Sequence, residues 1–178
     1  TGGFIHYLNK YVNDNDKKNK DKFKSNIYGN DKTADVIKPL LINLLLHGID
    51  VENIKKQNSL SKNNCENFLE KFDVCVGNPP FGVKNKIKFK NFENINETGF
   101  NYWPNFMKSG KELVKDSMGQ FLIHVINSLK IGGRFSLITD RGILNNGTEN
   151  KSLQKKLRKW VLSNCDITEI ILLPKGIF

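Results

Sequence analysis

A short apolar run near the middle of the chain ends in four residues whose types and order could act on a planar nitrogen base. Residues 73–77 form the run, and Asn78, Pro79, Pro80 and Phe81 follow it directly. The run predicts a buried strand. Open α/β sheets bind their ligands at the carboxyl ends of their strands, so we take the Asn78–Phe81 turn as the candidate site.

The residue types of this turn suit the methylation of an exocyclic amine such as that of adenine. Such an amine is a poor nucleophile, because its lone pair is delocalised into the ring. The side-chain oxygen of Asn78 and the carbonyl of Pro79 can accept its hydrogens, and the locked φ of proline keeps the acceptors in place. Phe81 offers a stacking face to a flipped-out base, an interaction worth roughly 1–3 kcal/mol. Taken alone, the tetrapeptide also fits an ordinary proline-rich turn.

The elements expected around this turn alternate between strands and helices. Helical spacing of apolar residues predicts helices over residues 3–12, 33–47, 121–129 and 151–163. Short apolar runs predict strands over residues 25–29, 53–57, 73–77, 134–139 and 167–173. Residues 13–24, 61–67 and 131–133 are interpreted as a polar helix end with its loop, a loop and a turn, and residues 83–116 as an insertion or lid loop. This order predicts an α/β protein with a mainly parallel, doubly wound sheet.

Composition restricts the class of protein. The chain has 178 residues, 38% of them hydrophobic, enough for one domain with a core. Its net charge of +10 fits a polyanionic partner such as nucleic acid, or simply an abundance of lysine. The widely spaced Cys65, Cys75 and Cys165 exclude a disulfide framework, and no Cys/His spacing predicts a metal site. No apolar run is long enough to cross a membrane, so we expect an intracellular (cytoplasmic) protein without a membrane partner.

Several segments resemble, in order, the motifs of amino-methylating DNA methyltransferases, and together they resemble the modification subunit of type I restriction–modification systems. The Asn78–Phe81 turn matches the catalytic motif of that family. The segments that resemble its S-adenosylmethionine site are Thr1, Gly2, Gly3 and Phe4 at the end of the loop that cradles the cofactor, Asp31 at the ribose, and Asn58, Ser59 and Leu60 at the adenine. The family usually has glutamate in place of Asp31 and aspartate in place of Asn58. Further matches are residues 43–49, 132–134, 142–144 and 172–178.

The resemblance implies a Rossmann-like methyltransferase fold that uses S-adenosylmethionine to methylate an adenine flipped out of DNA. It also implies a separate specificity subunit and a restriction subunit as partners. Residues 1–178 would then be a partial catalytic domain without the family's first strand, which lies in mid-sheet, and its last strand, so we expect this stretch alone to bind cofactor weakly and to be inactive. Two alternatives stay open: methylation of RNA or of a protein glutamine by a relative with the same Asn-Pro-Pro core, and a catalytically inactive nucleic-acid-binding subunit. Phe81 weighs against the glutamine enzymes, which usually carry tyrosine there.

Overall fold

The computed structural model describes residues 2–80, 102–109, 112–113, 116–147, 152–174 and 176–177. Thr1, Phe81 and most of the predicted lid at residues 83–116 lie outside these ranges. The helices are α1 (Gly3–Asn15), α2 (Lys20–Ser25), α3 (Ala34–Leu46), α4 (Lys62–Phe68), the 3-10 turn η1 (Asn105–Met107), α5 (Ser117–Ser128), α6 (Gly142–Asn145) and α7 (Leu153–Asn164). The strands are β1 (Gly29–Asp31), β2 (Ile54–Lys56), β3 (Phe72–Gly77), β4 (Lys108–Ser109), β5 (Glu112–Leu113) and β6 (Leu129–Leu137).

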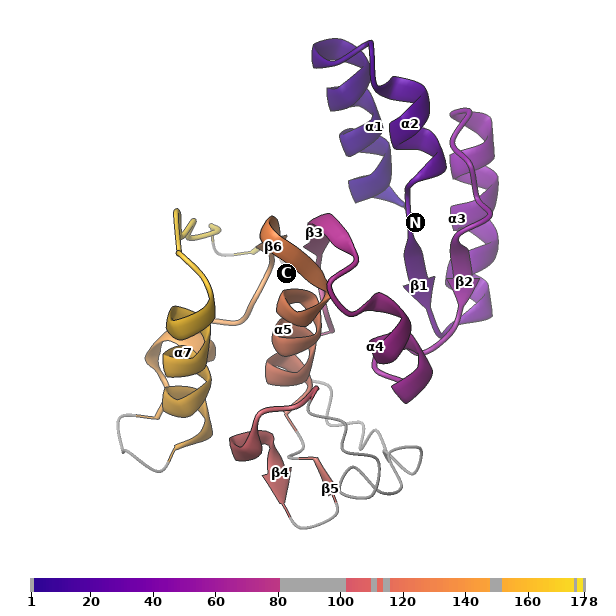
Figure 1. Ribbon diagram of the computed structural model, residues 1–178. Coiled ribbons are helices and arrows are strands. Elements are labelled where there is room, and N and C mark those ends of the chain that lie inside the picture. Colours follow the sequence, from indigo (N-terminus) through magenta and orange to yellow (C-terminus); the bar gives the residue numbers. More distant parts are fainter. Residues whose placement is uncertain are drawn as a thin grey trace.

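Two parallel strand pairs form the framework of the fold (Figure 1). β1 pairs with β2, and β3 pairs with β6; α3 connects the first pair, and α5 precedes β6 in the second. A short antiparallel hairpin of β4 and β5 lies near the start of α5, at the other end of that helix from β3 and β6 (Figure 1). The expected α/β class with parallel strands is therefore confirmed. A continuous doubly wound sheet is not formed by the described strands, since β1 and β3 each pair along one edge only.

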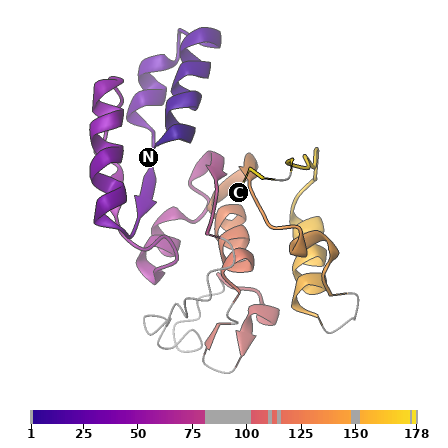
Figure 2. The ribbon, with the colours of Figure 1, turned by 180° about the vertical axis from the view of Figure 1, so that it is seen from behind.

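The amino-terminal half packs around the first strand pair. α1, α2 and α3 gather at one end of the molecule, and α7 stands at the other end in both views (Figures 1 and 2). The buried apolar residues of this half are Ile27, Ile37, Leu40, Leu44, Ile49 and Ile54. Gly48 ends α3 with a φ of 64°, as its place after the helix predicts. Pro39 lies inside α3, and the helix continues past it without interruption to Leu46.

A second core lies between α4, α5 and α7. Its fully buried members include Leu60, Cys65, Ile123 and Leu157. Trp103 is 1% exposed and packs into the same core, with Tyr102 beside it. Part of the stretch predicted as a lid is therefore anchored on the domain by the side chains of Tyr102 and Trp103. Burial of large aromatic rings supplies much of the hydrophobic stabilisation of such a cluster.

Three aromatic rings join the two halves at the starts of their strands. Tyr28 precedes β1 and Phe72 begins β3, and their ring centroids are 5.2 Å apart. Phe68 at the end of α4 lies 4.9 Å from Phe72. The ammonium of Lys71 lies over the Tyr28 ring, 4.3 Å from its centroid, which adds a cation–π contact.

One predicted loop is wrong because tertiary packing overrides its polar sequence. Residues 61–67 form most of helix α4 rather than a loop, since Asn64 and Cys65 bury one face of it. Residues 131–133, predicted as a turn, lie within the bounds of β6 but bulge out of it: none of them pairs with β3, and Ile131 is fully exposed. The pairing of β6 with β3 shifts register between Phe72 and Val74, which lets the strand pass through Gly132 at a φ of 79°.

The final predicted strand, residues 167–173, is not assigned as a strand in the structure. Its apolar side chains are exposed, with Ile171 at 70% and Leu172 at 68%. A β-strand needs a neighbour for its backbone hydrogen bonds, and no described strand pairs with this segment. The apolar pattern of residues 167–173 is typical of a strand, but a pattern within the segment does not reveal whether another strand lies beside it.

Candidate functional site

The Asn78 turn lies where the sequence predicts it, at the carboxyl end of β3. The last pairing of β3 with β6 joins Gly77 to Leu137, and the Ile138 amide donates to the Gly77 carbonyl at 3.0 Å. Pro79 is buried, whereas Asn78 and Pro80 are exposed. None of the described residues forms a hydrogen bond with the Asn78 side chain. Its amide is therefore presented to solvent from a turn that a buried proline anchors.

Asp31 lies at the carboxyl end of β1. Its Oδ1 accepts from the Thr33 amide at 2.8 Å, which fixes the carboxylate beside the start of α3. Among the described residues none donates to Oδ2, so that oxygen can accept from a ligand hydroxyl. The backbone N–H of Gln57 donates to the Asp31 carbonyl at 2.9 Å and thereby joins the end of β1 to the end of β2.

The turn of Asn58, Ser59 and Leu60 follows β2 directly. The Leu60 amide donates to Asn58 Oδ1 at 3.1 Å, a local bond that Asn commonly makes in turns. The Leu60 side chain is fully buried in the second core, so it anchors the turn. Asn58 and Ser59 stay half-buried at the surface. The hydrogen bond from the Gln57 backbone N–H to the Asp31 carbonyl places Asp31 beside the residue that precedes this turn.

Gly2, Gly3 and Phe4 lie elsewhere, beside the second half of α3 and the start of β1. A Cβ atom on Gly2 would meet Leu40 Cδ1 at 2.6 Å, and Gly2 has a φ of 83°. The Ile5 side chain lies 3.7 Å from the position of a Cβ on Gly29, the first residue of β1. The structure thus does not bring the glycine segment to the end of β1 that carries Asp31.

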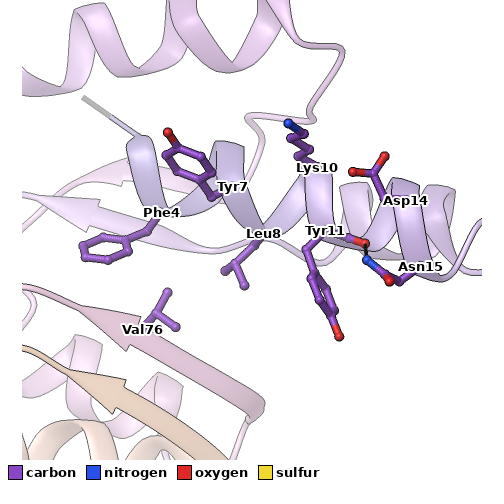
Figure 3. A pocket seen from close by; sticks show the side chains of 8 residues that line it. All are labelled: Phe4, Tyr7, Leu8, Lys10, Tyr11, Asp14, Asn15 and Val76. Carbon is purple, nitrogen blue, oxygen red and sulfur yellow. Dashed lines mark hydrogen bonds between the residues drawn. The ribbon is translucent and has the colours of Figure 1, made fainter. Parts of the chain in front are cut away.

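A cavity of about 520 Å³ lies between α1 and β3 (Figure 3). Phe4, Leu8 and Tyr11 of α1 face Val76 of β3 across it. The lining contains Phe4 but not Asp31, Asn58 or Asn78. Lys10, Asp14 and Asn15 of α1 also line it, and it is separate from the strand ends that carry Asp31 and Asn78.

Thiol and metal chemistry have little support in this part of the molecule. Burial raises the pKa of the Cys75 thiol to about 11 and that of Cys65 to about 12, so both stay protonated at neutral pH. The described residues contain no group of three or more His, Cys, Asp or Glu that could hold a metal ion. No helix within the described ranges is long and apolar enough to cross a membrane.

Sequence reasoning missed Arg158 of α7, which organises the loop after β6, residues 142–147, including its short helix α6 (Gly142–Asn145). Its Nη1 donates to the carbonyls of Ile143 and Asn146 at 2.9 and 2.7 Å, and its Nη2 donates to the Gly147 carbonyl at 3.1 Å. This loop follows the strand that pairs with β3. A lysine-rich helix gave no signal that one of its cations is committed to three backbone carbonyls.

We expect Arg158→Lys to loosen this loop, because an ammonium cannot reproduce the planar fork of the guanidinium. The lost charged hydrogen bonds should lower the free energy of unfolding by about 1–3 kcal/mol. Hydrogen exchange should accelerate within residues 142–147. Arg134→Lys is the matched control, since Arg134 is exposed on β6. Equal free energies of unfolding and equal hydrogen-exchange rates in both variants would contradict a stabilising role for the three Arg158 hydrogen bonds.

The fold is that of an α/β protein with parallel strands. Polar residues lie at the carboxyl ends of these strands: Asp31 and the Asn58–Leu60 turn after β1 and β2, and the Asn-Pro-Pro turn, anchored by Pro79, after β3. Residues 1–178 match the model of the N-6 DNA Methylase family, and the chain belongs to that family. It is also 29% identical over 183 residues to the methylase subunit of the type I restriction enzyme EcoEI from Escherichia coli. That alignment covers 100% of this chain and 33% of the relative, so the chain spans about a third of the relative's length. The resemblance seen in the sequence is thereby confirmed.

Proposed function

We propose that the protein transfers a methyl group from S-adenosylmethionine to the exocyclic amine of adenine in DNA. The observation that carries the proposal is the exposed Asn78 amide on a turn anchored by the buried Pro79, in a chain of the N-6 DNA Methylase family. Enzymes of this kind need rigid acceptors at a strand end, and a proline-locked backbone supplies that rigidity. The net charge of +10 suits a polyanionic substrate.

In this proposal the chain acts by holding the amine rather than by forming a covalent bond to it. The Asn78 Oδ1 and the Pro79 carbonyl accept the hydrogens of the amine and orient its lone pair toward the methyl group. With the donor bound, these two acceptors would hold the amine in line with the methyl group while the nitrogen–carbon bond replaces the sulfur–carbon bond and the amine releases one proton to solvent. Phe81, outside the described residues, is proposed to stack on the flipped base. Positioning of this kind can supply a large part of a rate enhancement.

We propose that Asp31, Asn58 and Ser59 hold the nucleoside part of the cofactor. Asp31 Oδ2 suits a ribose hydroxyl, because Oδ1 already accepts from the Thr33 amide. The Asn58–Leu60 turn can contact the same ligand, because Gln57, the residue before it, is hydrogen-bonded to the Asp31 carbonyl. The bound cofactor supplies an activated methyl group on a positively charged sulfur. Thr1, Gly2, Gly3 and Phe4 remain proposed cofactor contacts on the strength of the resemblance alone, and they would have to approach the end of β1 to make them.

We propose further that the two strand pairs are parts of one doubly wound, Rossmann-like sheet. Both pairs are parallel, and the chain passes from β2 to β3 through α4 without pairing the two sheets directly. The free edges of β1 and β3 leave room for a strand between them. A crystal structure of the natural full-length protein tests this proposal through its strand order.

The partners follow from the relative that the chain resembles. We propose that the protein works as the methylase subunit of a restriction–modification system, with a specificity subunit that selects the DNA sequence and a restriction subunit. This proposal rests on the similarity to a type I methylase subunit. Co-purification of the full-length protein with a specificity subunit encoded beside it is the direct test, and failure to associate would leave a stand-alone methylase.

The test of the proposed activity is transfer of a radioactive methyl group from S-adenosylmethionine to nucleic acid by the full-length protein with its specificity subunit. We expect label in duplex DNA as N6-methyladenine after digestion, and none in RNA of the same sequence. Label in RNA or in protein glutamine alone would favour the first alternative. DNA binding without incorporation would favour the catalytically inactive subunit.

A further inference from the structure

A network of three buried or half-buried amide side chains underlies the Asn58–Leu60 turn. Asn64 of α4 is 2% exposed, and its Nδ2 donates to the Ser59 carbonyl at 2.7 Å. Its Oδ1 accepts from Asn30 Nδ2 of β1 at 2.9 Å and from Gln57 Nε2. Gln57 Nε2 also donates to Asn30 Oδ1 at 3.0 Å. The three amides therefore connect the ends of β1 and β2 to the first residues of α4.

The position of this network gives it a role beyond packing. Asn30 is the residue before Asp31, and Gln57 is the residue before Asn58. Both residues proposed to contact the nucleoside thus follow directly on a member of the network. Within the described residues, the turn makes one side-chain bond of its own, from the Leu60 amide to Asn58 Oδ1, and the Cys65 thiol donates weakly to the Ser59 carbonyl at 3.9 Å. If the Asn64 amide were absent, the half-buried Ser59 carbonyl would keep only the weak thiol donor of Cys65 among the described side chains.

We infer that Asn64 is a positioning residue, which holds the Asn58–Leu60 turn against the Asp31 strand end so that both can bind the nucleoside of the cofactor. The inference rests on the proposed function. Asn64 does not itself reach the ligand, because it is buried beneath the turn. A satisfied polar network rigidifies its surroundings, whereas a partly satisfied one disrupts them. Disruption should therefore weaken cofactor binding more than the transfer step or DNA binding.

Asn64→Asp separates these roles sharply. The carboxylate keeps the acceptors for Asn30 and Gln57, but it replaces the donor to the Ser59 carbonyl with an oxygen that repels it. We expect the dissociation constant for S-adenosylmethionine, and for S-adenosylhomocysteine, to rise about tenfold in calorimetric titrations. The KM for cofactor should rise by a similar factor, with the KM for DNA and kcat unchanged. Amide exchange at Leu60 should become faster.

The matched control is Asn127→Asp on α5. Asn127 Nδ2 donates to the Tyr102 carbonyl at 2.6 Å, so this variant loses the same kind of bond at a half-buried place away from the turn. It should lose similar thermal stability and keep the cofactor affinity of the wild type. Gln57→Met, which removes one donor at a less buried position, is the second variant if Asn64→Asp fails to fold. It should raise the cofactor dissociation constant in the same direction.

The outcomes distinguish this inference from the proposed function. If the wild-type protein neither binds the cofactor nor transfers a methyl group, both the proposed function and the positioning role of Asn64 are excluded. Active wild-type protein with an unchanged cofactor dissociation constant in Asn64→Asp, or in Gln57→Met where the first variant does not fold, would overturn the inference alone. An equal loss of affinity in Asn127→Asp would overturn it as well, because the effect would then be general destabilisation. A loss confined to the Asn64 and Gln57 variants supports it.

Discussion

Replacing Asn78 by alanine should lower methyl transfer to DNA by about 10²–10³-fold, the loss typical when one preorganised hydrogen-bonding group of an active site is removed. The physical reason is that the amine of the target base would keep only the Pro79 carbonyl as an acceptor. Stability should change by no more than about 0.5 kcal/mol, because the Asn78 side chain is exposed and bonded to no described residue. The measurement is kcat with saturating cofactor and DNA, beside a thermal unfolding curve.

Asn67→Ala is the matched control for this variant. Asn67 is an exposed asparagine on α4, outside the Asn78 turn and with no role in the amide network. Its replacement should leave both kcat and stability unchanged. Cofactor affinity should also be retained in Asn78→Ala, since the proposed acceptor serves the substrate amine. Full activity in Asn78→Ala would exclude the proposed role, and a large loss of stability would assign Asn78 a structural one instead.

The strand that carries Asn78 could be predicted because its signal is local. An apolar run followed by Asn78 and Pro79 must end where proline removes a backbone donor, and residues before proline favour extended geometry. The prediction of residues 73–77 was correct to within one residue of β3. The helices rich in leucine were predictable for the same reason, since one apolar face recurs every three to four residues.

The support beneath the site could not be predicted, because it consists of polar residues buried by partners far away in the chain. Asn64 belongs to a segment with too few apolar residues to indicate a helix, yet its amide finds acceptors and donors on β1 and the turn. Nothing in local composition distinguishes such an asparagine from a solvated one. Arg158 is the same case, since its three carbonyl partners come from a loop more than ten residues away.

The glycine segment illustrates a different limit. A motif predicts which residues can serve a cofactor but not where packing will hold them. Gly2 is placed by contact with Leu40 and by the start of α1, and those contacts favour the amino end of β1. Its left-handed φ and the close side chain require glycine irrespective of any ligand. The structural need for glycine is therefore explained without a cofactor, and its role toward one stays a prediction.

The buried His124 should make the protein sensitive to mild acid. Its Nδ1 lies 2.6 Å from the Tyr102 hydroxyl and 3.7 Å from Cys65 Sγ, in the second core. Burial lowers the pKa of His124 from 6.5 to about 4, because the charged ring would lose its hydration. In the unfolded chain the ring regains its ordinary pKa and binds a proton below about pH 6.5. The unfolded state therefore holds more protons than the folded state between pH 6.5 and 4.

Stability must accordingly fall as the pH drops through this window, and it is unaffected by this group above it. Each pH unit between the two pKa values is worth about 1.4 kcal/mol, so the free energy of unfolding should decrease by about 3 kcal/mol between pH 6.5 and 4. Below about pH 4 the folded protein also binds the proton, and the contribution of His124 levels off. Urea unfolding at closely spaced pH values measures this slope.

His124→Gln identifies the group responsible for the slope. Glutamine does not titrate and can still accept from the Tyr102 hydroxyl, so the variant should lose most of the pH dependence between 6.5 and 4, whatever its stability at neutral pH. His47→Gln is the matched control, because His47 is exposed at the end of α3 and its removal should leave the slope intact. A slope that persists in His124→Gln would assign the acid sensitivity to carboxylates instead. A slope that disappears in His124→Gln and persists in His47→Gln would assign the acid sensitivity to His124, the one buried imidazole among the described residues. The core between α4 and α5, which also supports the Asn58–Leu60 turn, would then be destabilised when this imidazole becomes charged.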